Sequence, residues 1–224
     1  MTFSLVMGGE DVVVDPSYLN YNEDENRRKY KSIKYHSCLT FGDREPFEYL
    51  TRWTFGEQKA GSTASAYEGD GLLGADAYHE NYDPAQHRRL CALLDKDTFL
   101  VLDDVYNPAR ECVRLRFHMS TREYSRLGNT VTNGRVWVYL PCGRQEIIPA
   151  TKSPFTDIEE PSSIILTEPK AQGERELYLT VFSTRGDISD TAAVRRGEEI
   201  EISITRNGKR EMLSWKFNDY CKKI

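Results

Sequence analysis

Two Asn-Gly pairs, each set between alternating apolar segments, are the feature that most constrains the fold of this chain. They are Asn133-Gly134 and Asn207-Gly208. Asn-Gly readily adopts the positive φ angles of a tight hairpin connection. Other short apolar segments recur at spacings of roughly 8 to 15 residues, and none shows a sustained helical period. The sequence therefore predicts an all-β fold, namely an antiparallel, multi-stranded β-sandwich.

The middle of the chain predicts a buried hairpin followed by a half-buried strand. Residues 86–94 and 98–103 flank Lys96-Asp97, and the run 99–102 is continuously apolar, so we expect it to be buried on both faces. Residues 112–119 alternate and predict a strand with one apolar side. The expected apolar side holds Val113, Leu115 and Phe117, and the opposite side holds Arg114, Arg116 and His118.

The domain organisation depends on the segment 151–162, which contains proline and several acidic residues. With 224 residues, the chain is long enough for one large all-β domain or two small ones. We interpret 151–162 as a connection. It either divides 1–224 into two sub-domains near 150–162 or joins two sheets of one sandwich.

Composition bounds the class of protein. The net charge of -5 argues against a nucleic-acid binder, and no stretch has the roughly 18 apolar residues of a membrane span. Five cysteines, with no close pair, fit neither a metal knuckle nor a disulfide framework, so we expect reduced, mostly buried thiols and, on that criterion, a cytoplasmic location. Residues 1–7 do not form a signal peptide, and their apolar start predicts a fragment of a longer protein.

Asp15 and His36 are the candidate metal ligands. Asp15 follows the apolar strand 11–14, and His36 lies in the basic segment 34–41, which predicts a second strand after a polar loop or single helical turn at 22–29. An acid and a histidine at two strand ends would meet at one place and offer oxygen and nitrogen to zinc. The alternatives are an Asp-Pro turn and a hydrogen-bonded histidine.

Aromatic and basic side chains are dense around these two residues. Tyrosines at 18, 21, 30 and 35 form either a sugar-facing platform or packing on the sandwich rim. The basic residues between 27 and 34 form either a rim for a polyanionic glycan or a solvated face balanced by nearby acids. The candidate ligand-binding residues here are Tyr18, Tyr21 and Arg28.

The remaining histidines and tryptophans have weaker assignments. We interpret His87 and Arg88 as surface positions on a strand, with a cleft-facing, substrate-binding role as the alternative. His118 is expected to face solvent or another domain. Trp53, Trp137 and Trp215 are interpreted as core or sheet-face residues.

Several of these motifs together resemble the C-terminal β-domain of the heparinase II/III-like polysaccharide lyases. The resemblance covers most of the chain and rests first on FSLVMGGEDVVVDPSYLNY and on the following KSIKYH segment. The pieces HRR at 87–89 and LRFH at 115–118 are similar to later family strands. One departure is Ser37, where the family usually has asparagine after the histidine.

The resemblance implies a supersandwich-type β-domain that forms one wall of a cleft against an N-terminal α-helical toroid absent from this chain. It implies β-elimination at a uronic acid, with the catalytic residues on the toroid and in the segment just upstream, so this chain alone would be inactive. It also implies a structural zinc held by Asp15, His36 and a third ligand upstream of Met1. Family members are often periplasmic or secreted.

The expected partners are an acidic polysaccharide or oligosaccharide and the toroid, with no nucleic acid and no membrane. Heparan, alginate and other uronate glycans all fit this chemistry. The alternative is a stand-alone carbohydrate-binding or scaffold β-sandwich without catalysis. Glycan binding that weakens on Tyr18→Ala or Tyr21→Ala would favour a binding module, and zinc binding lost on His36→Ala would favour the lyase relationship.

Overall fold

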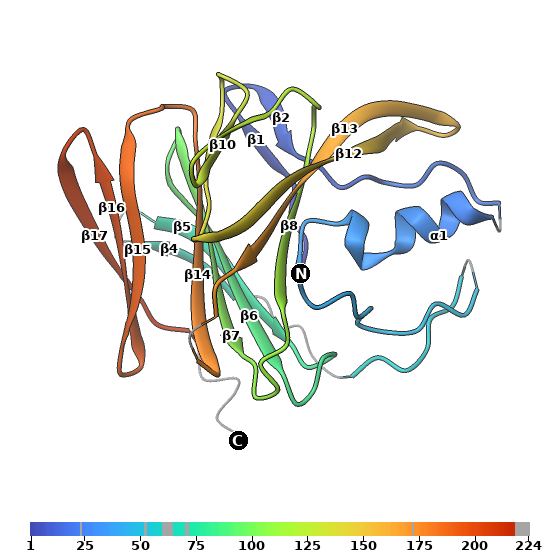
Figure 1. The fold of residues 1–224 in the computed structure, drawn as a ribbon, viewed down its shortest axis with the longest axis horizontal. Coiled ribbons are helices and arrows are strands. Elements are labelled where there is room, and N and C mark those ends of the chain that lie inside the picture. The colour runs from blue at the N-terminus through green and yellow to red at the C-terminus, as the bar shows by residue number, and fades with distance from the viewer. Residues whose placement is uncertain (23, 52, 60–64, 70–71, 172, 218–224) are drawn as a thin grey trace.

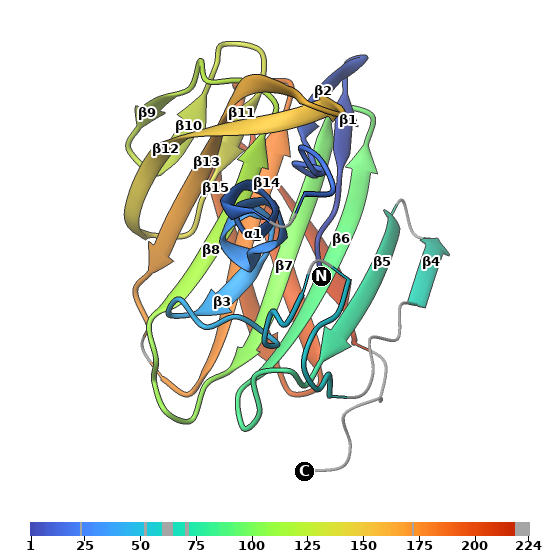
Figure 2. The same ribbon diagram turned by 90° about the vertical axis from the view of Figure 1, so that its right-hand side faces the viewer.

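The strands of this chain form three antiparallel sheets stacked as layers, and one short helix lies over the outer face of the six-stranded sheet (Figures 1 and 2). The structure is a computed structural model that describes residues 1–22, 24–51, 53–59, 65–69, 72–171 and 173–217. The predicted all-β sandwich is therefore confirmed. No helix in the described part is long and apolar enough to cross a membrane.

The six-stranded sheet has the order β1-β2-β8-β13-β12, with β3 also paired to β8. Its strands are β1 (Leu5–Met7), β2 (Glu10–Val13), β3 (Leu39–Phe41), β8 (Val113–Met119), β12 (Gly143–Phe155) and β13 (Ile158–Pro169). The three-stranded sheet consists of β15 (Ile188–Arg196), β16 (Glu199–Arg206) and β17 (Lys209–Trp215).

The eight-stranded sheet is the middle layer and has the order β4-β5-β6-β7-β14-β11-β10-β9. Its strands are β4 (Ser65–Gly69), β5 (Leu72–His79), β6 (Gln86–Asp95), β7 (Thr98–Tyr106), β9 (Ser125–Leu127), β10 (Thr130–Thr132), β11 (Trp137–Tyr139) and β14 (Arg175–Ser183). Between β2 and β3 lie the helix α1 (Glu25–Lys31) and the 3-10 helix η1 (Ile33–Tyr35).

Both faces of the middle sheet are buried. Phe99 and Val101 on β7 pack into the core shared with the six-stranded sheet, while Leu100 and Leu102 pack into the core shared with the three-stranded sheet. Each fully buried apolar side chain contributes about 1.5 to 3 kcal/mol. The prediction that 99–102 is buried on both faces is confirmed, because this strand lies between two other layers.

The two Asn-Gly pairs form turns of different length. Asn207 and Gly208 both have positive φ angles and link β16 directly to β17, as the two-residue turn predicts. Asn133 belongs to a longer connection between β10 and β11, in which its side-chain oxygen accepts bonds from the backbone of Arg135 and Val136. Both hairpins are confirmed.

Several predicted elements were wrong. The segment 151–162 is not a connection: it forms the far part of the hairpin β12–β13, whose turn uses Asp157 at φ 61°. The predicted strand 34–41 is limited to β3, because Ser32 ends α1 and its side chain then accepts a bond from Lys34 to start η1.

Two smaller expectations also need correction. The polar loop or single helical turn predicted at 22–29 is a seven-residue helix that continues to Lys31. Of the cysteines, Cys38 is buried as expected and Cys91 is half-buried, but Cys112 and Cys142 are exposed, and Cys221 lies outside the described residues.

Candidate functional site

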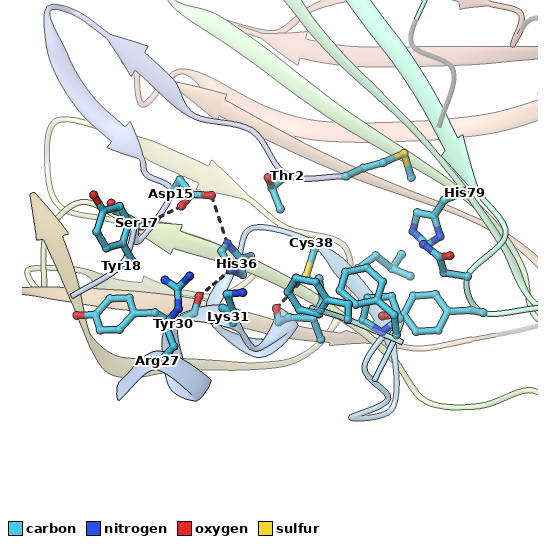
Figure 3. A pocket seen from close by; sticks show the side chains of 18 residues that line it. Thr2, Asp15, Ser17, Tyr18, Arg27, Tyr30, Lys31, His36, Cys38 and His79 are labelled. Carbon is cyan, nitrogen blue, oxygen red and sulfur yellow. Dashed lines mark hydrogen bonds and ion pairs between the residues drawn. The ribbon is translucent and has the colours of Figure 1, made fainter. Parts of the chain in front are cut away.

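A pocket of about 590 Å³ lies beside α1 and reaches the end of β5 (Figure 3). Asp15 and Tyr18 line it from the segment after β2, Arg27 from α1, His36 from the segment before β3, and His79 from the end of β5. The pocket therefore brings together both predicted metal ligands, one predicted ligand-binding tyrosine and two residues that the sequence did not single out.

His36 and Asp15 face each other in this pocket. The His36 Nε2 atom donates to the backbone oxygen of Tyr30 at 2.9 Å, and its Nδ1 atom lies 3.3 Å from Asp15 Oδ2. With its first proton on Nε2, the ring presents a lone pair at Nδ1 to a carboxylate, so a second proton or a cation has to lie between them. The bond with His36 is the main reason why the pKa of Asp15 lies below its usual value.

His118 on β8 fixes the segment that carries His36. Its Nδ1 atom lies 2.7 Å from the backbone oxygen of Tyr35, and its Nε2 atom lies 2.7 Å from the hydroxyl of Ser162. A neutral ring satisfies both by donating from Nδ1 and accepting at Nε2. Burial lowers the pKa of His118, which agrees with the neutral form. The expectation that His118 faces solvent was wrong, because η1 and the residues after it cover this side of β8.

Ser37, where the resemblance led us to expect asparagine, also holds the His36 segment against β8. Its hydroxyl accepts the backbone N–H of His118 at 2.9 Å, and the serine is only 2% exposed. A buried N–H without a partner would cost about 1 to 3 kcal/mol. Ser37 therefore supplies the side-chain acceptor that ties the His36 segment to β8.

α1 is held against the hairpin β12–β13 by Tyr30. Asp24 caps the helix by accepting the N–H of Arg27 at 3.0 Å, and the Tyr30 hydroxyl donates to Glu159 at 2.8 Å. Lys29 bonds the same carboxylate at 3.0 Å. Tyr30 is 1% exposed, and burial raises its pKa. The tyrosines were predicted either to form a sugar-facing platform or to pack on the sandwich rim, and Tyr30 packs.

A row of aromatic rings leads outward from the pocket. The Tyr18 and Tyr21 ring centroids are 4.5 Å apart, and Trp53 stacks on Tyr21 at 5.4 Å. The guanidinium of Arg27 lies within 6 Å of all three centroids. Trp53 is 63% exposed, so its assignment to a core or sheet face was wrong. Arg28 is exposed and lies over Tyr49, outside the residues that line the pocket.

His87 and Arg88 point to opposite faces of β6 because neighbouring residues alternate along a strand. His87 is 1% exposed, so its surface assignment was wrong, whereas Arg88 lies over Phe217 on the side of the three-stranded sheet. The Nε2 atom of His87 lies 2.6 Å from Asp103, which also binds Arg89 at 2.7 Å. His87 thus belongs to a buried ionic cluster next to the pocket.

His79 extends this cluster to the pocket wall. It pairs with His87 across β5 and β6, and the two ring centroids lie 5.6 Å apart. Burial, and then the neighbouring His87, lower the pKa of His79 to about 3. The pocket wall therefore presents a neutral imidazole at this end.

The comparisons with known proteins assign the family. The model of the family "Heparinase II/III-like, C-terminal" matches residues 1–216. This chain belongs to the heparinase II/III-like family. No curated protein sequence gives a significant match.

Solved structures related to this heparinase II/III-like chain share its fold at low identity. A heparinase III gene product is 18% identical, with a TM-score of 0.79 over 96% of this chain and 36% of that chain. A mutant of the heparan sulfate lyase HepC from Pedobacter heparinus is 15% identical, with a TM-score of 0.74 over 98% of this chain and 37% of that chain. Another heparinase III is 19% identical, with a TM-score of 0.73 over 96% and 35%. The chain thus spans about a third of the length of these structures.

Sequence reasoning placed Arg27 of this heparinase II/III-like chain only in the general group of basic residues between 27 and 34, and it assigned no role to His79 or Tyr82, which also line the pocket. Arg27 lies in a run of basic residues, and the sequence does not show that it is the one on the buried face of α1. His79 had a usable signal, since a hairpin between β5 and β6 aligns it with His87.

Proposed function

We propose that this chain is the C-terminal β-domain of a polysaccharide lyase that cleaves uronic-acid-containing glycans by β-elimination, and that it forms one wall of the substrate cleft. The observation that carries the proposal is the pocket in which the Asp15–His36 pair lies beside Arg27 and an aromatic ring. Membership of the family supports it, and so do the related structures, which are those of a heparinase III and of a heparan sulfate lyase.

The chemistry explains why a cationic, aromatic wall suits such a substrate. β-Elimination next to a uronate needs the carboxylate neutralised, a base for the ring proton and an acid for the leaving oxygen. In this proposal Arg27 contributes positive charge inside the pocket, Arg28 contributes it at the rim, and Tyr18 and Tyr21 contact sugar rings. Arg88, predicted to bind substrate, has no role in this proposal, because it lies on the other face of β6, over Phe217. The catalytic residues and the helical toroid would belong to the remainder of a longer protein.

We also propose that Asp15 and His36 hold a structural zinc ion. Tetrahedral zinc with ligands at roughly 2.1 Å keeps its donor atoms about 3.4 Å apart, close to the 3.3 Å between His36 Nδ1 and Asp15 Oδ2. The bond from His36 Nε2 to a backbone carbonyl is the usual second contact of a metal-bound histidine. Because the described residues contain no group of three or more such ligands, a further ligand would have to come from elsewhere.

Zinc titration tests the metal site. With two protein ligands we expect weak binding by wild type, lost in His36→Ala and kept in His79→Ala, measured by calorimetry and by the rise of the melting temperature with zinc. The two variants are matched, since each removes one pocket histidine. Equal zinc binding by wild type and His36→Ala would contradict the assignment.

The lyase assignment is tested on the polypeptide in its native source. Intact mass spectrometry after immunoprecipitation should give a mass far above 25.8 kDa, with additional helical sequence. The 224-residue chain by itself should release no unsaturated uronate from heparan sulfate or alginate, as followed by ultraviolet absorbance. A native mass of 25.8 kDa would favour a stand-alone binding module, and release of unsaturated uronate would contradict the proposed division of labour.

A further inference from the structure

We infer that Tyr21 and Trp53 form a stacking platform for a sugar ring just outside the pocket, so that the chain holds a second unit of an acidic oligosaccharide there. The inference rests on the proposed function, because it takes a uronate-containing glycan as the ligand. It adds Trp53, which lies in a separate segment of the chain, to the ligand-binding residues.

The first observation is an exposed pair of stacked rings. Tyr21 is 45% exposed and Trp53 63% exposed, yet their rings stack at 5.4 Å with only 21° between their planes. Two large aromatic side chains that lie against each other and keep this much surface in water form an exposed apolar patch, and such patches mark binding sites. The apolar face of a sugar ring fits a flat aromatic surface of this kind.

The second observation is that the platform is held in place before any ligand arrives. The side chain of Thr51 accepts the N–H of Trp53 and bonds Thr54, so the indole is presented from a closed turn. On the other side, the side-chain oxygen of Asn20 accepts the backbone N–H of Asn22, which closes a turn that contains Tyr21. The side-chain nitrogen of Asn20 donates to Asp157 in the β12–β13 turn. A preformed surface avoids the entropic cost of ordering side chains on binding.

The third observation is the charge behind the rings. Arg27 is only 7% exposed, and its guanidinium lies 5.2 Å from the Tyr21 centroid and 5.8 Å from the Trp53 centroid. A partly desolvated cation attracts the electron-rich ring faces and fixes their orientation. It also gives the platform a positive potential, which favours a carboxylated or sulfated sugar over a neutral one.

The fourth observation sets the direction in which the glycan runs. Tyr18 lines the pocket, contacts Tyr21 at 4.5 Å, and Tyr21 in turn contacts Trp53. The row of rings is therefore continuous from the pocket to the outer surface. One sugar unit at the pocket places the next unit of the same chain over Tyr21 and Trp53.

The test measures binding of hexasaccharides of heparan sulfate and alginate, with maltohexaose as the neutral probe, by calorimetry and by tryptophan fluorescence. Trp53→Ala should weaken binding of the acidic probe at least roughly tenfold, while Trp53→Phe, which keeps a ring, should weaken it by less than about threefold. Tyr67→Ala, which removes an exposed ring on β4, is the matched control and should leave binding unchanged. Saturating ligand should change the fluorescence of wild type, because Trp53 is the exposed indole.

The outcomes separate this inference from the proposed function. Acidic hexasaccharides that bind wild type and Trp53→Ala equally well, or that saturate wild type without a fluorescence change, overturn the platform and leave the proposed function standing. Binding of maltohexaose alone, lost in Trp53→Ala, supports a stacking platform but overturns the acidic ligand and the proposed function. Binding of none of the three probes overturns both.

Discussion

Replacing Asp103 by Asn should strongly destabilise this chain. Asp103 is completely buried, binds Arg89 through both of its oxygens at 2.7 and 3.1 Å, and lies 2.6 Å from His87. The guanidinium of Arg89, only 2% exposed, has Asp103 as its ionic partner and otherwise donates to backbone oxygens such as that of Ser37 at 2.9 Å. Asparagine keeps the shape of the site but leaves this guanidinium buried without a counter-charge.

The magnitude follows from the burial of both partners. Removing one member of a buried ion pair costs about 3 to 5 kcal/mol, because the desolvation penalty of the other charge is no longer offset. Single domains have about 5 to 15 kcal/mol of stability in total, so the variant should be close to unfolding. Replacing both residues with apolar ones, as in Arg89→Met with Asp103→Leu, should recover part of the loss, since neither charge then remains, although His87 and the backbone oxygen of Ser37 lose their partners.

Urea unfolding followed by circular dichroism measures the effect. Burial raises the pKa of Asp103, but the charge of Arg89 and the bond with His87 outweigh it, so the pKa lies below its usual value. A depressed carboxyl pKa gives stability that is present above the unfolded value of about 3.9 and is lost as pH falls through the folded value. The free energies of unfolding of wild type and Asp103→Asn should therefore show their full difference at pH 7 and become similar at acidic pH. A loss below about 1 kcal/mol at pH 7, or a double variant no better than the single one, would refute the reasoning.

Two further predictions concern the pocket wall and the longest hairpin. The pKa of His79 is depressed from about 6.5 to about 3, so its contribution to stability is full above pH 6.5 and is lost as pH falls toward 3. Urea unfolding at several pH values should show a steeper loss for wild type than for His79→Phe, and parallel curves would disprove the assignment. Gly143→Ala should cost at least about 1 to 3 kcal/mol in the same assay, because the new Cβ would lie 2.1 Å from the backbone oxygen of Glu168. Gly173→Ala, with 3.8 Å of clearance, is the control and should cost less.

Local sequence patterns predicted strands and turns correctly where a single physical requirement determined the residue types of a whole segment. The apolar run 99–102 and the turn Asn207-Gly208 were read correctly, because burial on two faces and positive φ angles each demand particular residue types. The segment 151–162 misled the prediction because its prolines suggested a connection. Pro161 instead lies within β13, paired with Thr151 on β12.

The candidate site was only partly predictable, since it depends on contacts between distant segments. The approach of Asp15 and His36 was predicted from their expected places at two strand ends, although His36 in fact follows η1 and not a strand. The exposure of Trp53 was not foreseen, because no local pattern reveals that Tyr21 comes to lie against it. That the side chains of His87 and Arg88 point to opposite faces of β6 could have been predicted from strand alternation alone.

The covering of both faces of the middle sheet has a consequence for how this family can vary. A residue changed on β6, β7 or β14 alters the packing of a neighbouring layer, so these strands have little freedom to acquire a new ligand. The stretch between β2 and β4, by contrast, holds α1, η1 and most of the pocket, and the one named strand among its described residues is β3. We therefore expect this stretch to accept substitutions more readily than the buried strands of the middle sheet, apart from the residues that bond β8 and the β12–β13 hairpin. If the proposed function holds, grafting residues 14–64 from a relative with another glycan preference should transfer that preference while the three sheets stay as they are.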